Sequence, residues 1–313
     1  MPTFSIRGAA FSGFIFAREK PLVILVWFLF SLILAVGQAW LSVVMVGDTM
    51  TQLQALQAHP DPANASAILG LLGKIIPFYG VVIVIALLTA AVTSAAAARS
   101  VLRPEPVGIG YLGFGGDELR MLVVSLVIGI IIGVVYIIGL VITEVIALVA
   151  SGAINTMRTG AATLPPSMFI IWGLAFLPVL AGIIALGVKF SMASAQTVDS
   201  RSISIFGSWG VTAGHFWRIL GAYLLSVLLF LPVALLGMAV VAGAAVILGG
   251  GLEAARALMS RADMSSMLAY FTPLRIIFMV IGSIYTALAL AVFGRTPAVI
   301  YAQLTERDHA DVF

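Results

Sequence analysis

Six long apolar stretches dominate this sequence and leave few folds open to it. An α-helix rises about 1.5 Å per residue, so about 20 apolar residues cross the roughly 30 Å hydrocarbon core of a bilayer. The sequence therefore predicts an all-α polytopic membrane protein, built as a single membrane domain over residues 1–313. The six predicted transmembrane helices cover residues 21–46, 68–91, 121–149, 168–188, 219–248 and 274–293.

The composition is that of a chain whose main solvent is lipid. Hydrophobic residues make up 62% of the chain, charged residues make up only 9%, and the mean hydropathy is +1.17. This is too little charge for a water-soluble surface of this size. Cysteine is absent, and His59, His215 and His309 show no metal-ligand spacing, so we expect no metal and no cofactor. The basic residues form no stripe that would bind nucleic acid.

The distribution of lysine and arginine predicts the orientation. With six crossings, 11 of the 16 basic residues fall on the side that carries both termini, and 5 fall on the other side. Because positively charged loops remain in the cytoplasm, we expect a multi-pass protein of the plasma (inner) membrane with both termini cytoplasmic.

Sequence landmarks recur at a regular spacing along the chain. Lys20, Arg120 and Arg218 each precede an odd-numbered helix, and a proline lies near the outer end of each even-numbered helix. This period predicts three helical hairpins that enter and leave on the same side, related by an axis along the membrane normal. Evenly spaced hairpins without duplication would give a similar period. The repeats would cover residues 1–103, 104–201 and 202–313.

Aromatic residues before two of the odd-numbered helices predict short helices in the cytoplasmic interface. Before the fifth transmembrane helix, Phe206, Trp209, Phe216 and Trp217 fall at helical spacing, and Arg218 follows them. Aromatic side chains at this depth lie among lipid headgroups and arginines meet lipid phosphates, so we expect these residues to contact lipid. A second such segment precedes the first transmembrane helix. The alternative is an ordinary aromatic belt at the helix ends.

Polar residues at membrane depth are candidates for function, because a charge at the bilayer centre costs about 2.5 to 3.5 kcal/mol. Glu144 lies inside the third predicted helix and would serve a transporter as a proton or cation site. Near the outer interface, however, its carboxylate would reach water. Lys74 and Arg275 occupy similar outer positions and would either pair with Glu144 or extend to the interface.

Glycines in the third predicted helix suggest close helix packing. Gly129 and Gly133 form a G-x-x-x-G pattern in an apolar segment, and small residues allow helix backbones to approach. Packing within the chain and dimerisation both remain open for this pattern. A G-x-G-x-x-G run at 108–113 lacks the βαβ context of a nucleotide site.

Residues 208–221 read SWGVTAGHFWRILG. The segment resembles the helix entry of bacterial YciC-like proteins and of the membrane domain attached to some glycerophosphodiester phosphodiesterases. The resemblance implies a bacterial six-helix membrane protein with amphipathic entries. It does not imply hydrolysis, because the soluble phosphodiesterase domain has no counterpart in this chain.

Two function classes follow from these features. The first is an accessory or scaffolding subunit, or a lipid-associated membrane protein, and it is favoured because no catalytic constellation is present. Its partners would be membrane lipids, together with a membrane protein complex or further copies of the chain. The alternative is a small transporter or channel with a pathway between the hairpins. An enzyme is not expected.

Overall fold

The computed structural model describes residues 4–58, 64–103, 108–152, 166–251, 253 and 263–305. Among these residues there is no β-strand, and the one extended pairing is an isolated bridge between Ile109 and Leu112. Six helices are long and apolar enough to cross a membrane, and each contains one of the predicted spans. The prediction of an all-α, six-helix membrane protein is therefore confirmed.

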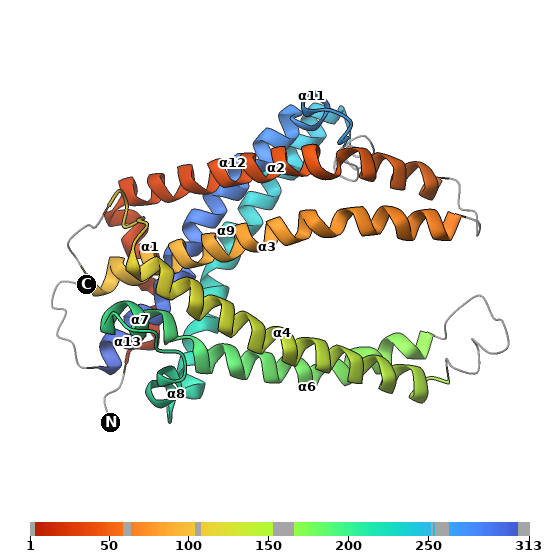
Figure 1. Cartoon of the computed structure of the whole chain (residues 1–313). Coiled ribbons are helices and arrows are strands. Elements are labelled where there is room, and N and C mark those ends of the chain that lie inside the picture. The colour runs from red at the N-terminus through yellow and green to blue at the C-terminus, as the bar shows by residue number, and fades with distance from the viewer. Residues whose placement is uncertain are drawn as a thin grey trace.

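The six long helices form three hairpins (Figure 1). Each pair of neighbours in the order α6, α4, α3, α2, α12 and α9 is in contact, so the hairpins adjoin one another along the series. The pairs are α2 (Pro21–Ala58) with α3 (Ala65–Leu102), α4 (Gly116–Ala150) with α6 (Pro166–Phe190), and α9 (Phe216–Gly249) with α12 (Pro273–Ala289).

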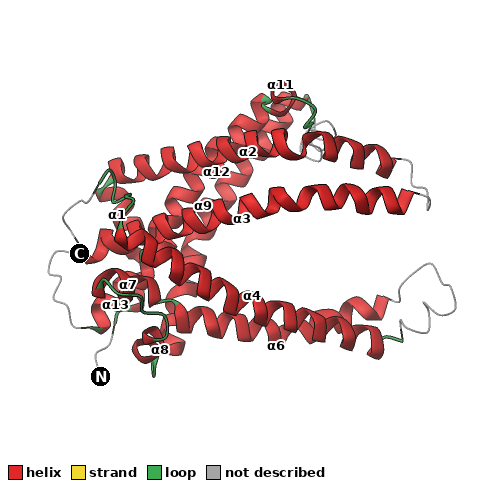
Figure 2. Ribbon diagram, viewed as in Figure 1, coloured by secondary structure: helices red, strands yellow, loops and turns green. Residues whose placement is uncertain are grey.

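Most of the short helices gather at the end of the bundle where the chain enters and leaves each hairpin (Figure 2). We call this the near end, and we call the opposite ends of the six long helices, together with α11 (Met267–Tyr270) just before α12, the far end. A π-helical turn, η2 (Leu290–Gly294), connects α12 to the near end. The short helices of the near end are α1 (Ile6–Glu19), α7 (Ala193–Ser200), α8 (Gly207–Thr212) and α13 (Thr296–Leu304).

The near end holds the largest core of the protein. The last turns of α3 pack against α7 and α13, and all three are rich in buried alanine. Ala95, Ala195 and Ala298 belong to this core, and their small side chains allow the helix backbones to approach closely. The sequence therefore places alanine where three helices converge.

Helix α1 forms as predicted, but part of its surface belongs to the core. A Cβ atom on Gly13 would overlap the backbone of Ala291 and Val292, so α1 lies directly against the π turn. Phe11 and Ile15 remain exposed on its other face. One side of α1 thus anchors the bundle, and the other is free to contact lipid.

The far end is packed much more sparsely. Val46, Leu53, Leu71 and Ile75 form a small cluster between α2 and α3, and the long helices otherwise expose apolar side chains over most of their surface.

The three hairpins are not introduced by equivalent segments. Helix α1 precedes the first, a non-helical stretch at 108–115 precedes the second, and α8 precedes the third. The threefold internal repeat therefore remains a prediction.

Candidate functional site

A groove of about 890 Å³ lies between α2, α3 and α12. This volume is within the roughly 300 to 1,000 Å³ range of small-molecule sites. Apolar side chains such as Val82, Ile85 and Phe278 make up much of its wall. Polar side chains from all three helices also line it, namely Ser31, Gln38, Ser42, Thr89, Thr93, Arg275, Ser283 and Thr286.

Several hydroxyl groups in the groove are bonded to their own helices. Ser42 donates to the carbonyl of Gln38 at 2.8 Å, Ser283 to that of Met279 at 2.7 Å, and Thr286 to that of Gly282 at 2.8 Å. Such bonds to the preceding turn satisfy the donor but leave oxygen lone pairs free to accept. The hydroxyls therefore make the groove polar without requiring a ligand.

Gln38 is different, because its side chain is exposed in the groove and hydrogen-bonds to no described residue. A primary amide in an apolar surrounding costs free energy unless another polar group pairs with it. Gln38 is therefore a polar group that a ligand could satisfy.

Arg275 lies at the far end of the groove, on the first turn of α12. Pro273 occupies the start of this helix and Thr272 caps it by accepting from the Arg275 backbone N–H at 3.4 Å, which fixes where the side chain begins. The guanidinium lies over the Tyr270 ring, 4.6 Å from its centroid. No described carboxylate forms an ion pair with it. Arg275 is thus a positive charge held in place by an aromatic ring.

Glu144 lies outside this groove. Its side chain is exposed on α4 and accepts a hydrogen bond of 2.8 Å from the indole N–H of Trp172 on α6, and Trp172 stacks on Phe176. Within the described part of the chain it pairs with neither Lys74 nor Arg275. The three predicted intramembrane charges therefore do not form one site.

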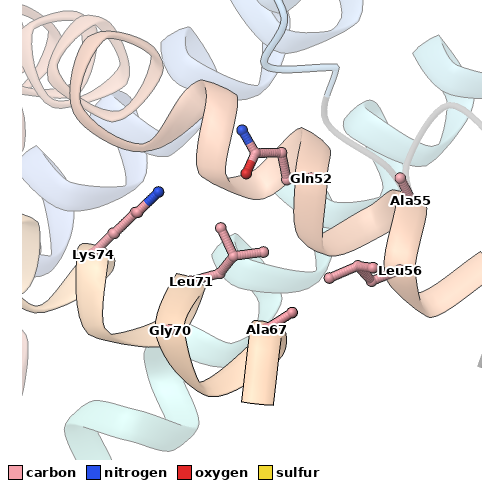
Figure 3. A pocket seen from close by; sticks show the side chains of 7 residues that line it. All are labelled: Gln52, Ala55, Leu56, Ala67, Gly70, Leu71 and Lys74. Atoms are coloured by element: carbon pink, nitrogen blue, oxygen red, sulfur yellow. The ribbon is translucent and has the colours of Figure 1, made fainter. Parts of the chain in front are cut away.

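Lys74 lines a separate, smaller hollow of about 490 Å³ between α2 and α3 (Figure 3). Figure 3 shows Lys74 and Leu71 on α3 facing Gln52 and Leu56 on α2. Lys74, which is exposed, and Gln52 are the polar residues of this hollow, and its other lining residues are small or apolar. That Lys74 extends to the interface remains a prediction.

Gly129 and Gly133 have no packing role among the described residues. A Cβ atom built on either glycine would meet no other atom within 4 Å. The close approach between α4 and α6 occurs at Gly139 instead, where a Cβ atom would overlap the side chain of Val179. Gly129 and Gly133, the two predicted packing glycines, therefore lie on a surface of α4 that no other described helix covers.

The predicted amphipathic segment before α9 is two helices and not one. Helix α8 ends at Thr212, and Gly214 has a φ of +77°, a left-handed conformation that glycine adopts without strain. Phe206, Trp209 and Trp217 are exposed as expected, with Trp217 78% exposed. Phe216, however, packs against the near-end core, and Arg218 donates to the carbonyl of Phe4 at 2.8 Å.

A buried charge cluster at the near end was not predicted from the sequence. Arg99 pairs with Glu118, and both side chains are almost fully buried. Glu118 also accepts the backbone N–H of Gly115 at 2.9 Å, while Asp117 pairs with Arg103 at 2.7 Å and with Arg120 at 3.0 Å. The cluster joins the end of α3 to the start of α4. A signal was available in the acidic pair that opens α4 soon after the basic end of α3.

Arg295 is a second buried cation of the near end. It donates to Ser100 at 2.9 Å and to the carbonyl of Ser12 at 3.2 Å, and it lies 3.8 Å from the centroid of the Phe16 ring. It therefore connects α1, α3 and α13 in the near-end core.

Comparison with known proteins adds no relative: no family model, no curated protein and no solved structure matches this chain.

Proposed function

We propose that this chain is an accessory, lipid-associated protein of the bacterial inner membrane. The observation that carries the proposal is the groove between α2, α3 and α12, which combines apolar walls with an unpartnered amide and a positive charge. Inside a bilayer, polar groups of this kind acquire partners from lipid or from another protein. A lipid can supply both kinds of contact at once.

The near end supports a cytoplasmic placement in this proposal. Apart from Arg307, which lies outside the described residues, the basic residues of the predicted cytoplasmic side belong to the near end, in keeping with the positive-inside rule. Phe206, Trp209 and Trp217 are exposed there, where aromatic side chains would contact the headgroup region. The open glycine surface at Gly129 and Gly133 offers a face for a protein partner or a second copy.

One observation favours the alternative, a small transporter. The groove carries polar residues on all three of its helices, and a π turn, a feature frequent at functional sites, lies at its near end. Glu144, the residue expected to serve transport, lies outside it.

The test is purification of the full chain in a mild detergent, followed by identification of the proteins and lipids that remain bound. Retained phospholipid or a stoichiometric protein partner is the expected result. A chain that retains neither and that conducts substrate flux when reconstituted alone in liposomes would replace the proposal with the transporter.

A further inference from the structure

We propose that the groove between α2, α3 and α12 binds a single phospholipid, with its phosphate on Arg275 and its glycerol ester region at Gln38. This inference rests on the proposed lipid association and names the ligand class and the residues that would recognise it. It places the headgroup at the far end of the bundle and the acyl chains along the apolar wall.

Arg275 and Gln38 lie at similar distances from the near end, measured along their helices. Arg275 lies at the start of a continuous helical path that reaches the near end at Gly294, and Gln38 lies on α2, which leaves the near end at Pro21. At about 1.5 Å per residue, Arg275 is about 28 Å and Gln38 about 25 Å from the near end. Measured along their helices, the two residues are therefore at similar distances from the near end, and both line the groove toward its far end.

On α12, the wall of the groove next to Arg275 is apolar for about two helical turns. On α12, the next polar side chain that lines the groove is Ser283, about 12 Å along the helix from Arg275. Phe278 and Met279 line the groove within that interval, and Val82 and Ile85 face it from α3. The order of a charged end, an amide and then apolar side chains is the order of phosphate, ester and acyl chain in a phospholipid.

The charge of Arg275 suits a phosphate. Its guanidinium forms no ion pair with any carboxylate in the described ranges, and Tyr270 covers one of its faces. The N–H groups of a guanidinium point outward in its plane, so a ring on one face leaves them free for a bidentate contact with phosphate oxygens. Gln38 supplies two further donors for an ester carbonyl.

The experiment compares phosphatidylglycerol with diacylglycerol of the same acyl chains, which lacks the phosphate. Binding to the full chain in detergent is followed by native mass spectrometry and by the thermal unfolding midpoint as each lipid is added. Wild type is expected to bind phosphatidylglycerol in preference to diacylglycerol. Arg275→Gln is expected to lose about tenfold in affinity for phosphatidylglycerol while its affinity for diacylglycerol is unchanged.

Three further variants separate recognition from folding. Arg275→Lys keeps the positive charge and is expected to retain most of the binding. Gln38→Leu is expected to lower the affinity for both phosphatidylglycerol and diacylglycerol, because both lipids carry the ester region. Lys74→Gln is the matched control: it removes a far-end charge that lines the other hollow, and it is expected to change nothing.

Equal binding of phosphatidylglycerol to wild type and to Arg275→Gln would overturn the site, and the lipid association would survive if phospholipid were still retained. A chain that no phospholipid binds would overturn both proposals. An Arg275→Lys variant as weak as Arg275→Gln would contradict recognition by charge. A photoreactive phospholipid should crosslink to peptides of α2, α3 or α12; crosslinks confined to other helices would also overturn the site.

Discussion

The two ends of the bundle differ in how their helices are held together. At the near end, short helices fill the space between the long ones, alanines allow close contact, and buried charges are paired or hydrogen-bonded. At the far end, the described helices are connected by small apolar clusters and by isolated contacts such as the hydrogen bond from Trp172 to Glu144, and the groove remains between α2, α3 and α12. The near end thus holds the fold together, and the groove at the far end is available to bind lipid.

The largest expected effect is at the buried ion pair of the near end. Arg99→Ala would leave Glu118 as a buried charge without its main partner, which should lower the free energy of unfolding by about 3 to 5 kcal/mol. Unfolding of the full chain in detergent, followed by circular dichroism, measures this change.

Arg7→Ala is the control for that variant, because Arg7 is exposed on α1 and should tolerate the change within about 0.5 kcal/mol. The double variant Arg99→Met/Glu118→Leu should recover part of the loss, since no buried charge remains. A loss below about 1 kcal/mol for Arg99→Ala would show that the near end does not depend on this pair.

A smaller effect is expected where α1 meets the π turn. Gly13→Ala would place a methyl group against the backbone of Ala291 and Val292, and overpacking of this kind costs about 1 to 3 kcal/mol. Gly129→Ala is the matched substitution on α4, where the methyl group meets open space; its stability should stay the same or rise slightly. Equal losses for the two variants would mean that α1 is not a close-packed part of the core.

The smallest effect is expected at Glu144. In Glu144→Gln the side-chain oxygen can still accept the hydrogen bond from Trp172, so stability should change by less than about 0.5 kcal/mol. Thermal unfolding measures this, with Trp172→Phe as the variant that removes the donor. A large loss of stability or of lipid binding in Glu144→Gln would show that Glu144 has a structural or functional role beyond this hydrogen bond.

The six spans could be predicted from the sequence because their signal is local: about 20 consecutive apolar residues suffice. The near-end core could not, because Ala95 and Ala298 are ordinary small residues until distant helices converge on them. Arg275 is recognisable as a far-end charge, but its groove depends on α2 and α3, which lie in the first third of the chain. The helix predicted across Phe206 to Trp217 is interrupted at Gly214, because this glycine adopts a left-handed backbone conformation that the aromatic spacing does not reveal.

Hydrogen exchange of the full chain in detergent, with and without phosphatidylglycerol, tests the contrast between the two ends most directly. We expect near-end amides around residues 95–102 to exchange slowest and not to respond to lipid, whereas amides of α11 and of the first turns of α12 should exchange faster and slow down when lipid is added. Near-end amides that exchange as fast as those of the far end, or lipid protection equal at both ends, would show that the two ends do not differ in this way.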